Sequence, residues 1–321
     1  MANYITIDGG TTNTRVSLVC NNTILATKKM SIGAGKKDIV SLKNAIKTAI
    51  KEILSENNLG ETAIERILAS GMITSEYGLC NLPHITAPAG IEELHNEMYE
   101  TVIEDVSEIP FVFIRGIKTE GTALDEADMM RGEETELMGL LKTHKDACLY
   151  ILPGSHSKHI SVDCNGRIVA LRTMMTGELL AAVMEHTILR DATSFEHNEI
   201  CKSDLFNGFH YAKKRGINEA LFKTRILKKR FNGTPEQCYS FLLGSVLCDE
   251  VEAILQANEK IIVLGGQKQF RTALALLLKE MSDKKIVMLS DWEVENSTSL
   301  GAIQIFEFHN PRDTYPHLNS I

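Results

Sequence analysis

Three stretches of alternating or clustered hydrophobic residues open the chain, and they predict three consecutive β-strands over residues 4–8, 15–20 and 23–30. Polar residues with turn character separate these strands. The first separator is Gly-Gly-Thr-Thr-Asn at residues 9–13, and the second is the pair Asn21-Asn22. Two such residues between strands are typical of a tight hairpin, because Asn tolerates positive φ. The pattern therefore predicts an antiparallel β-meander at the start of the chain.

Beyond this meander, helical periodicity alternates with short apolar runs. Residues 38–56 carry five apolar positions on one helix face, namely Ile39, Leu42, Ile46, Ile50 and Ile53. Further helices are predicted over residues 134–141, 179–189, 234 to about 255, 267–281 and 296–308, and buried strands over residues 66–70, 111–115, 260–264 and 285–289. Thr234 followed by Pro235 and, three residues after the cap, by Gln237 is a typical helix start. This alternation indicates an α/β protein.

The chain contains an internal repeat. When it is shifted by 144 residues, residues 151–171 align with residues 7–27 without a gap. The segment Gly-Ser-His-Ser-Lys at 154–158 then falls on Gly-Thr-Thr-Asn-Thr at 10–14, and Asn165-Gly166 falls on the Asn21-Asn22 turn. Two meanders can look alike by chance, but here glycine and hydroxyl residues coincide in the same turn. We therefore predict two duplicated α/β domains, residues 1–145 and 146–321, each opening with a βββ meander.

Composition excludes several classes of protein. Hydrophobic residues make up 44% and charged residues 24%, as in ordinary globular proteins. With 34 Lys and Arg against 42 Asp and Glu the net charge is −8, so we expect no nucleic-acid partner. No apolar run approaches the roughly 18 residues of a membrane span. Seven cysteines without a C-x-x-C pair argue against a disulfide framework or zinc site, and the first residues lack a secretory signal. We expect a cytoplasmic protein.

The polar stretch after the first strand has the chemistry of a phosphate-binding loop. It lies on a β-hairpin and lacks the G-x-x-x-x-G-K-[ST] pattern, which rules out a Walker-type loop. Gly9 and Gly10 would let the backbone approach a phosphate closely, and the hydroxyls of Thr11 and Thr12 add donors. Asp8 at the strand end could hold Mg²⁺ through water. The alternative is a tight hairpin with an acid at its corner.

The repeat adds a second hairpin of the same kind, and the two could clamp a triphosphate from both sides. This hairpin has Leu152 where the first has Asp8, but it offers His156 and Lys158. A cation there would offset charge on a transferring phosphoryl group. The alternative is a solvated turn. The turn Gly265-Gly266-Gln267 follows an apolar strand and opens a helix, a common nucleotide-binding position, although many α/β turns carry two glycines.

These motifs resemble a known group of proteins. Residues 7–15 are similar to the first phosphate motif of the sugar kinase/actin/heat-shock chaperone ATPase superfamily. More narrowly, residues 70–73 (SGMI), 130–136 (MRGEETE), 152–158 (LPGSHSK) and 175–179 (MTGEL) resemble the 2-keto-3-deoxygalactonate kinase family. The resemblance implies two ribonuclease-H-like domains with ATP in the cleft between them. It also implies ATP- and Mg²⁺-dependent phosphorylation of the 6-hydroxyl of 2-keto-3-deoxygalactonate, a small sugar acid, in galactonate breakdown.

The resemblance also implies roles for individual residues. Asp8, which would hold the metal, is expected to be catalytic together with His156 and Lys158. The residues expected to bind the ATP phosphates are Gly9, Gly10, Thr11, Thr12, Asn13, Gly154, Ser155 and Ser157, and those expected to bind adenosine are Gly265, Gly266 and Gln267. The residues expected to bind the sugar acid are Arg15, Ser70, Gly71, Met72, Arg131, Glu133, Glu134 and Glu178. An arginine can fork onto the substrate carboxylate and a glutamate can accept from its hydroxyls, although acids at an exposed helix start would explain Glu133, Glu134 and Glu178 nearly as well.

The sequence departs from the family in places. The family usually has Trp where this chain has Gly9, and a basic residue near Thr74-Ser75-Glu76, and residues 79–90 match only in part. The general base stays open among Asp8, Glu134 and His156. Two alternatives remain: a same-fold kinase for another small sugar, hydroxyacid or vitamin precursor, and a non-catalytic nucleotide switch. Helices expected over residues 201–231 could form a homodimer face.

Overall fold

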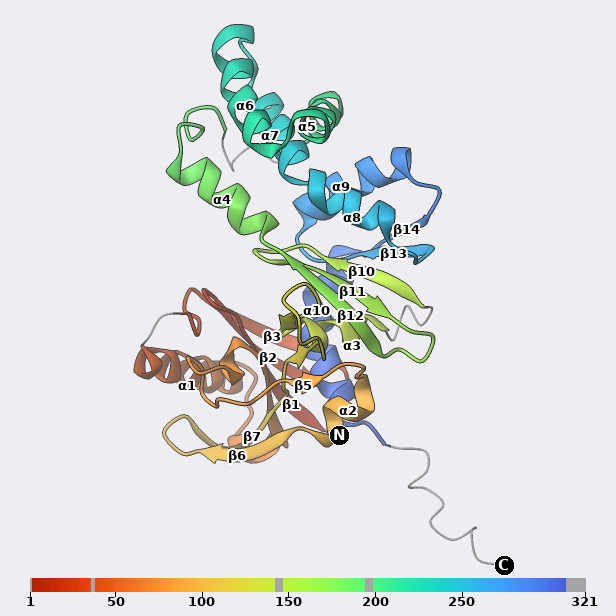
Figure 1. Ribbon diagram of the computed structural model, residues 1–321. Helices are drawn as coiled ribbons and strands as arrows, with labels where there is room; N and C mark the ends of the chain where they lie inside the picture. The colour runs from red at the N-terminus through yellow and green to blue at the C-terminus, as the bar shows by residue number, and fades with distance from the viewer. Residues whose placement is uncertain (1, 36–37, 142–146, 194–198, 310–321) are drawn as a thin grey trace, which may run out of the picture. The chain divides into compact units, whose positions relative to one another are not determined.

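The computed structural model describes residues 2–35, 38–141, 147–193 and 199–309, and its first three strands form the predicted meander (Figure 1). They are β1 (Asn3–Gly9), β2 (Thr14–Cys20) and β3 (Thr23–Met30), paired antiparallel. Asn21 and Asn22 have φ of 49° and 58°, which confirms the positive-φ turn. β4 (Arg66–Gly71), β7 (Ser107–Phe113) and β6 (Tyr99–Ile103) complete a six-stranded sheet in the order β3-β2-β1-β4-β7-β6.

A second sheet repeats this plan. Its strands are β10 (Cys148–Leu152), β11 (Ser157–Val162), β12 (Ile168–Met174), β13 (Ile261–Leu264) and β14 (Lys285–Met288), in the order β12-β11-β10-β13-β14. In both sheets the meander's first strand pairs in parallel with the next strand, β1 with β4 and β10 with β13. The duplication read from the 144-residue repeat is therefore confirmed in the strand order.

Helices cover the two sheets. α1 (Ile39–Glu56) starts at Asp38, whose carboxylate accepts from the Ser41 amide at 3.0 Å. The predicted stripe is largely buried, since Leu42, Ile46, Ile50 and Ile53 pack against the first sheet. The remaining helices are α2 (Ile91–Asn96), α3 (Glu133–Leu141), α4 (Thr176–His186), α5 (Lys202–Arg215), α6 (Ile217–Phe231), α7 (Pro235–Val246), α8 (Cys248–Gln256), α9 (Lys268–Met281) and α10 (Asp291–Phe306).

The structure differs from the sequence prediction in several details. The single helix expected from residue 234 to about 255 is divided at Leu247 into α7 and α8, although the predicted capping box at Thr234 and Gln237 is present. A small sheet of β5 (Ile85–Thr86), β8 (Ile117–Lys118) and β9 (Met129–Met130) was not predicted. Its two-residue strands are too short to leave a periodic signal. The same holds for the 3₁₀ turns at Glu61–Ala63 and Met72–Thr74.

The chain divides into two compact units. The first consists of residues 1–146, 162–171 and 292–321, and the second of residues 147–161 and 172–291. Each has its own apolar core, around Ile5, Ile50 and Phe111 in the first unit and around Phe209, Leu243 and Leu274 in the second. The domain limits 1–145 and 146–321 remain a prediction. No helix in the part of the chain that the structure describes is long and apolar enough to cross a membrane.

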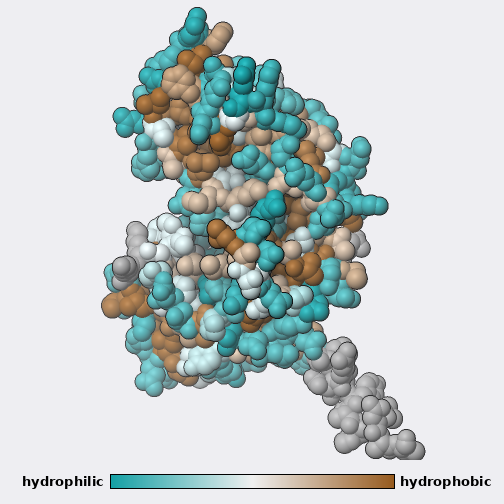
Figure 2. Space-filling model, in the orientation of Figure 1, coloured by the Kyte–Doolittle hydropathy of each residue, from teal (hydrophilic) through white to brown (hydrophobic). Residues whose placement is uncertain are grey.

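The helices expected over residues 201–231 are present as α5 and α6. Both end in basic clusters, Lys213 to Arg215 and Lys228 to Arg230, and the side chains of Phe222 and Phe231 on α6 are 52% and 71% exposed. In the space-filling view, hydrophilic residues alternate with smaller hydrophobic areas over the visible face (Figure 2). Self-association through α5 and α6 remains a prediction.

Candidate functional site

The first predicted phosphate loop follows β1 and is held in place by a neighbouring segment. The Gly10 amide donates to the Asn13 carbonyl at 2.8 Å, which closes the turn. The amides of Ala34 and Gly35 donate to the carbonyls of Gly10 and Thr11 at 2.9 and 2.8 Å. The side chains of residues 11–13 are exposed. The loop therefore has a fixed backbone and exposed hydroxyls. The Gly-Ala-Gly run at 33–35 that supports it was missed, although it lies shortly after the predicted strand 23–30.

At the end of β1, three of the predicted side chains share one face of the sheet. Asp8 pairs with Arg15 on β2 and with Ser70 on β4. The Arg15 guanidinium also donates to the Glu295 carbonyl at 2.9 Å. Ser70 is 1% exposed, and its hydroxyl has no hydrogen-bond partner among the described residues. An unpartnered buried hydroxyl is costly, so it marks a place where a ligand would supply the missing bond.

The backbones of the two strand ends approach each other closely. Gly71 has φ of +82°, and a Cβ at this position would lie 2.5 Å from the Gly9 carbonyl oxygen. Only glycine combines that conformation with that approach. Met72 follows immediately, in the 3₁₀ turn Met72–Thr74. The predicted substrate segment therefore starts directly beside the metal-binding candidate Asp8.

Glu134, one of the acidic residues at the start of α3, has a buried side chain. Its carboxylate oxygens accept from the Gly132 amide at 2.9 and 2.8 Å, and the residue is fully buried. Burial, followed by the charge of Glu133, raises the pKa of Glu134 to about 8, against the lowering effect of these hydrogen bonds. The Glu133 carboxylate accepts from the Arg131 amide at 3.1 Å. Both glutamates thus help to shape the turn that precedes α3.

A further acid, Glu136, belongs to the same electrostatic group and was missed. Burial, then the charges of Glu133 and Asp8, raise its pKa to about 8, against the opposing effect of Arg15. Burial likewise raises the pKa of Asp8, and Arg15 opposes this. The spacing of Glu136 three residues after Glu133 on one helix was the available signal. The raised pKa values mean that these carboxyl groups disfavour one another's ionised forms, and a cation bound beside Asp8 would stabilise those ionised forms.

Asp8 meets the requirements of a magnesium ligand. Among the described residues, no group of three or more His, Cys, Asp or Glu side chains is arranged to hold a metal ion. Mg²⁺ in kinases, however, is usually held by one or two carboxylates together with water and substrate phosphates. A single carboxylate at a strand end, beside a phosphate loop and close to further carboxyl groups, fits that mode of binding.

The Arg131 side chain is hydrogen-bonded to the segment at residues 74–82, which follows the predicted substrate residues 70–72. Its guanidinium donates to the carbonyl and hydroxyl of Thr74 at 2.7 and 2.6 Å and to the Leu82 carbonyl at 3.0 Å. Burial lowers its pKa, and the charge of Glu134 opposes this. These bonds hold the two ends of residues 74–82 together. In this structure Arg131 orders the segment after Met72.

In the second unit, only part of the second phosphate loop is accessible. Ser155 and His156 are exposed, whereas Ser157 and Lys158 are buried at the start of β11. The Lys158 ammonium donates to the Thr173 hydroxyl at 2.8 Å, and the Ser157 hydroxyl donates to Glu250 at 2.5 Å. The accessible donors of this loop are therefore in residues 154–156.

The start of α4 packs directly onto this loop. A Cβ at Gly177 would lie 2.1 Å from the Gly154 carbonyl oxygen, so the close approach requires glycine. The Glu178 amide donates to the Ser155 carbonyl at 2.9 Å, and the Glu178 carboxylate lies 2.7 Å from His156 Nε2. Two predicted site residues, His156 and Glu178, are thus brought into contact.

The predicted adenosine turn lies beside the same loop. The Gly265 amide donates to the Ile151 carbonyl at 2.8 Å, and the Gln267 amide donates to the Pro153 carbonyl at 2.7 Å. Gly266 accepts from the Arg271 guanidinium at 3.0 Å and has φ of 62°. The end of β13 is therefore tied to the residues just before Gly154, and the nucleotide motifs of this unit form one cluster.

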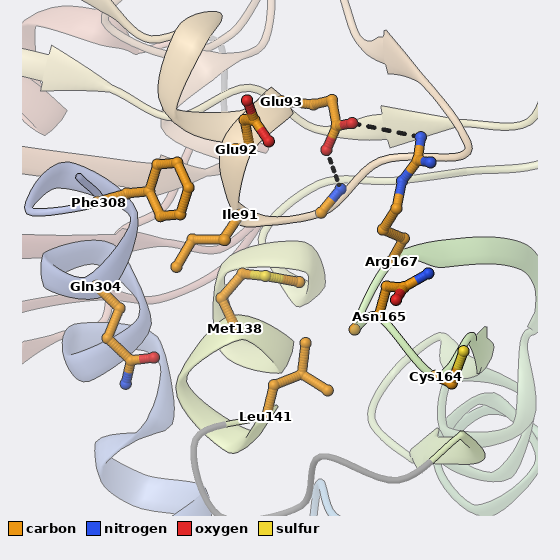
Figure 3. Close-up of a pocket in the computed structure, with 12 residues that line it drawn as sticks. Ile91, Glu92, Glu93, Met138, Leu141, Cys164, Asn165, Arg167, Gln304 and Phe308 are labelled. Carbon is orange, nitrogen blue, oxygen red and sulfur yellow. Dashed lines mark hydrogen bonds and ion pairs between the residues drawn. The ribbon is translucent and has the colours of Figure 1, made fainter. Parts of the chain in front are cut away.

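The first unit also contains a cavity of about 760 Å³ beside α2, α3 and α10 (Figure 3). Ile91, Met138 and Leu141 form an apolar wall, and Glu93 lies 3.3 Å from Arg167 at its rim. None of the described residues that line this cavity is a predicted site residue. The candidate chemistry therefore lies at the loops and strand ends.

Comparisons with known proteins agree with this picture. The family model described as 2-keto-3-deoxy-galactonokinase matches residues 8–295 of this chain. The 2-dehydro-3-deoxygalactonokinase of Escherichia coli (strain K12) is 26% identical over 258 residues, which cover 79% of this chain and 80% of that protein.

Two solved structures show the fold. A "putative 2-dehydro-3-deoxygalactonokinase protein" from Sinorhizobium meliloti superposes with a TM-score of 0.75 at 21% identity, covering 98% of this chain and 99% of that one. Component A of the (R)-2-hydroxyglutaryl-CoA dehydratase of Acidaminococcus fermentans gives a TM-score of 0.52 at 14% identity, covering 94% and 96%. The predicted α/β fold of the actin-like ATPase type, with two sheets that each open with βββ, is confirmed.

Proposed function

Because this chain belongs to the 2-keto-3-deoxy-galactonokinase family and is therefore a kinase, we propose that it phosphorylates the 6-hydroxyl of 2-keto-3-deoxygalactonate with ATP. The γ-phosphoryl group passes to the hydroxyl oxygen, ADP leaves, and the hydroxyl proton is released. The observation that carries the proposal is the pair of Asp8 and Ser70, a partly buried acid beside an unpartnered buried hydroxyl at the carboxyl ends of parallel strands. Ligands of open α/β sheets bind at such strand ends.

Each nucleotide motif has a role in this proposal. The backbone and hydroxyls of residues 9–13 bind phosphate oxygens from one loop, and residues 154–156 bind them from the other. Residues 265–267 bind the adenosine part. Ser157 and Lys158 support their loop from within, since both are buried and hydrogen-bonded. Phosphoryl transfer needs mainly positioning and charge stabilisation, which such loops supply.

Asp8 is the residue of this chain that would hold Mg²⁺. The ion would neutralise charge on the phosphates during transfer. A cation at Asp8 would favour the ionised form of Glu136, whose pKa is raised by burial and by the charges of Glu133 and Asp8, and the ionised carboxylate would then add to the attraction for the cation. Arg15 opposes that effect and balances the site when the metal is absent.

The sugar acid is bound by the segment that begins at Ser70. The Ser70 hydroxyl donates to or accepts from the substrate, and Gly71 and Met72 supply a backbone surface beside Asp8. Arg131 keeps residues 74–82 in place for this purpose. Its role is to order the pocket, because its guanidinium already binds two protein carbonyls.

His156 and Glu178 act together at the second loop. The carboxylate of Glu178 orients the imidazole through the 2.7 Å contact at Nε2. In this proposal His156 donates to the transferring phosphoryl group or takes the proton of the acceptor hydroxyl. A positioned histidine of this type contributes about 10²–10⁴-fold in rate in enzymes that use it.

A substrate panel tests the proposed function. The full chain is assayed for ADP release with ATP, Mg²⁺ and one acceptor at a time: 2-keto-3-deoxygalactonate, its C4 epimer, galactonate and glycerate. We expect the highest kcat/KM with 2-keto-3-deoxygalactonate and little ADP without an acceptor. A higher kcat/KM for another acceptor would assign the enzyme a different substrate. Equal ADP release with and without acceptor would contradict a kinase function.

A further inference from the structure

A buried carboxylate lies behind the second phosphate loop, at a position that no motif in the sequence marked. Glu250 on α8 is 1% exposed. Its Oε1 atom accepts from the Ser157 hydroxyl at 2.5 Å and lies 3.3 Å from His159 Nε2, while its Oε2 atom accepts from the Thr176 hydroxyl at 2.6 Å. One side chain thus joins three elements: α8, the start of β11 and the start of α4.

The carboxylate is stabilised as an anion by these contacts. Burial by itself would raise the pKa of Glu250, but hydrogen bonds and charge from His159, with the hydroxyls of Ser157 and Thr176, lower it below its ordinary value. A buried anion with three donors is strongly held, and removal of its donors would leave it without compensation. The three contacts therefore fix the relative positions of their elements tightly.

Glu250 links the start of β11 to the start of α4, and these two segments lie on either side of the accessible loop at residues 154–156. Ser157 immediately follows residues 154–156. Thr176 immediately precedes Gly177 and Glu178, which pack on Gly154 and hydrogen-bond to Ser155 and His156. Both segments are thus tied to one carboxylate.

We propose that Glu250 is a positioning residue for phosphoryl transfer. By holding Ser157 and Thr176 together it keeps the Gly154–His156 loop and Glu178 in the geometry that transfer requires. The inference rests on the proposed kinase function of this loop. Glu250 is too deeply buried to contact ATP or the sugar acid, so its effect passes entirely through the loop and α4.

The kinetic test compares three variants of the full chain. Glu250→Ala removes the tether, and Glu250→Gln keeps the shape and one acceptor oxygen. Ile254→Ala is the matched control, because Ile254 is fully buried one turn further on α8 and makes no polar contact to the loop. We expect Glu250→Ala to lower kcat by about 100-fold, the scale of a misplaced reacting group, with the KM for the sugar acid nearly unchanged. Glu250→Gln should recover part of the loss, and Ile254→Ala should lose thermal stability but retain kcat.

A second readout does not depend on turnover. Hydrogen exchange at the Glu178 amide reports the bond to the Ser155 carbonyl. Exchange at this amide should accelerate in Glu250→Gln and stay slow in Ile254→Ala. If Glu250→Ala fails to fold, the exchange measurement on Glu250→Gln still tests the proposal, because glutamine preserves the buried volume.

The outcomes separate the inference from the proposed function. If Glu250→Gln leaves both kcat and Glu178 exchange at wild-type values, the positioning role is wrong while the kinase function stands. The same holds if Ile254→Ala lowers kcat as much as Glu250→Ala. If the wild-type chain phosphorylates no acceptor, the proposed function fails, and faster Glu178 exchange in the variant would still support the tether.

Discussion

Ser70 lies directly opposite Asp8 in the parallel pairing of β4 with β1, so both side chains point to the same face of the sheet. Asp8 is a partly buried acid whose pKa is raised by burial, and Ser70 has a buried hydroxyl without a partner among the described residues. The two residues were predicted separately, one as a metal ligand and one as a substrate contact. Their adjacency makes them one site.

Replacing Ser70 tests the substrate contact. Ser70→Ala should lower kcat/KM for the sugar acid about tenfold or more, since losing one hydrogen bond of about 1.4 kcal/mol changes binding tenfold. The melting temperature should stay the same or rise, because the hydroxyl has no hydrogen-bond partner among the described residues. Steady-state kinetics and thermal unfolding measure both effects.

Ser17→Ala is the matched control for that variant. Ser17 lies on the same face of the same sheet, is 1% exposed, and shares a hydrogen bond of 3.0 Å with Thr27. This control should lose stability and keep kcat/KM. A Ser70→Ala protein that is destabilised yet fully active would show that the hydroxyl has no substrate role.

Asp8→Asn tests the metal site. The variant should fold and lose turnover by about 10³-fold or more, because a metal contact contributes several kcal/mol of transition-state stabilisation. A readout independent of activity is the rise in melting temperature that Mg²⁺ with ADP produces, which should disappear in the variant. Retained turnover, or an unchanged response to Mg²⁺, would remove Asp8 from the metal site.

His156→Ala and Glu178→Gln separate the two roles of the histidine. If His156 donates to the phosphoryl group, each variant should lower kcat by a similar factor across the pH range. If His156 is the general base, the wild-type profile should have an acidic limb that is absent in His156→Ala. We expect the pH-independent loss, since the repeat aligns His156 with Thr12 of the first phosphate loop. Loss of an acidic limb, with little change in alkaline solution, would instead identify the base.

Glu136 gives a prediction on stability. Its pKa in the folded protein is about 8, above the ordinary 4.5, so the folded state holds a proton that the unfolded state releases between these values. Its contribution to the free energy of unfolding therefore falls as the pH rises through this interval. Glu136→Gln should raise the melting temperature at pH 8 more than at pH 5, by a few degrees in metal-free buffer. A lower melting temperature of the variant at pH 8 would contradict the buried-charge account.

The duplicated fold could be predicted because the patterns that indicate it involve residues close in sequence. The hairpin at Asn21-Asn22, the helix stripe in residues 38–56 and the 144-residue repeat each depend on residues close in sequence. The break at Leu247 between α7 and α8 could not be predicted, since the apolar pattern of the buried helix α7 continues through the break into the buried face of α8. Tertiary packing decides such breaks.

Residues of the candidate site could be predicted only where they belong to a local sequence motif. Glu250 meets Ser157 from 93 positions away in sequence, and no local pattern links the two. The donors of Ser157, Lys158 and Arg131 were expected to reach ligands, but the structure shows them bound within the protein, which residue type alone does not reveal.

The structure gives a physical reason for Gly9, which stands where the family usually has Trp. A Cβ at this position would lie 2.8 Å from Ile73 Cβ. The 3₁₀ turn at Met72–Thr74 therefore leaves no room for a Cβ at residue 9 in this arrangement, and any larger side chain there would require Ile73 to move. The sequence showed that residue 9 differs from the family, but it did not show that Ile73 packs against Gly9.

The most direct test of the proposed kinase activity is the identity of the product. The full chain is incubated with ATP, Mg²⁺ and 2-keto-3-deoxygalactonate, and the product is examined by phosphorus NMR with proton coupling. A phosphate on the 6-hydroxyl couples to the methylene protons of carbon 6, so we predict a triplet that grows in step with ADP. A doublet from phosphate on a ring or chain CH–OH, or inorganic phosphate alone, would contradict phosphorylation at the 6-hydroxyl.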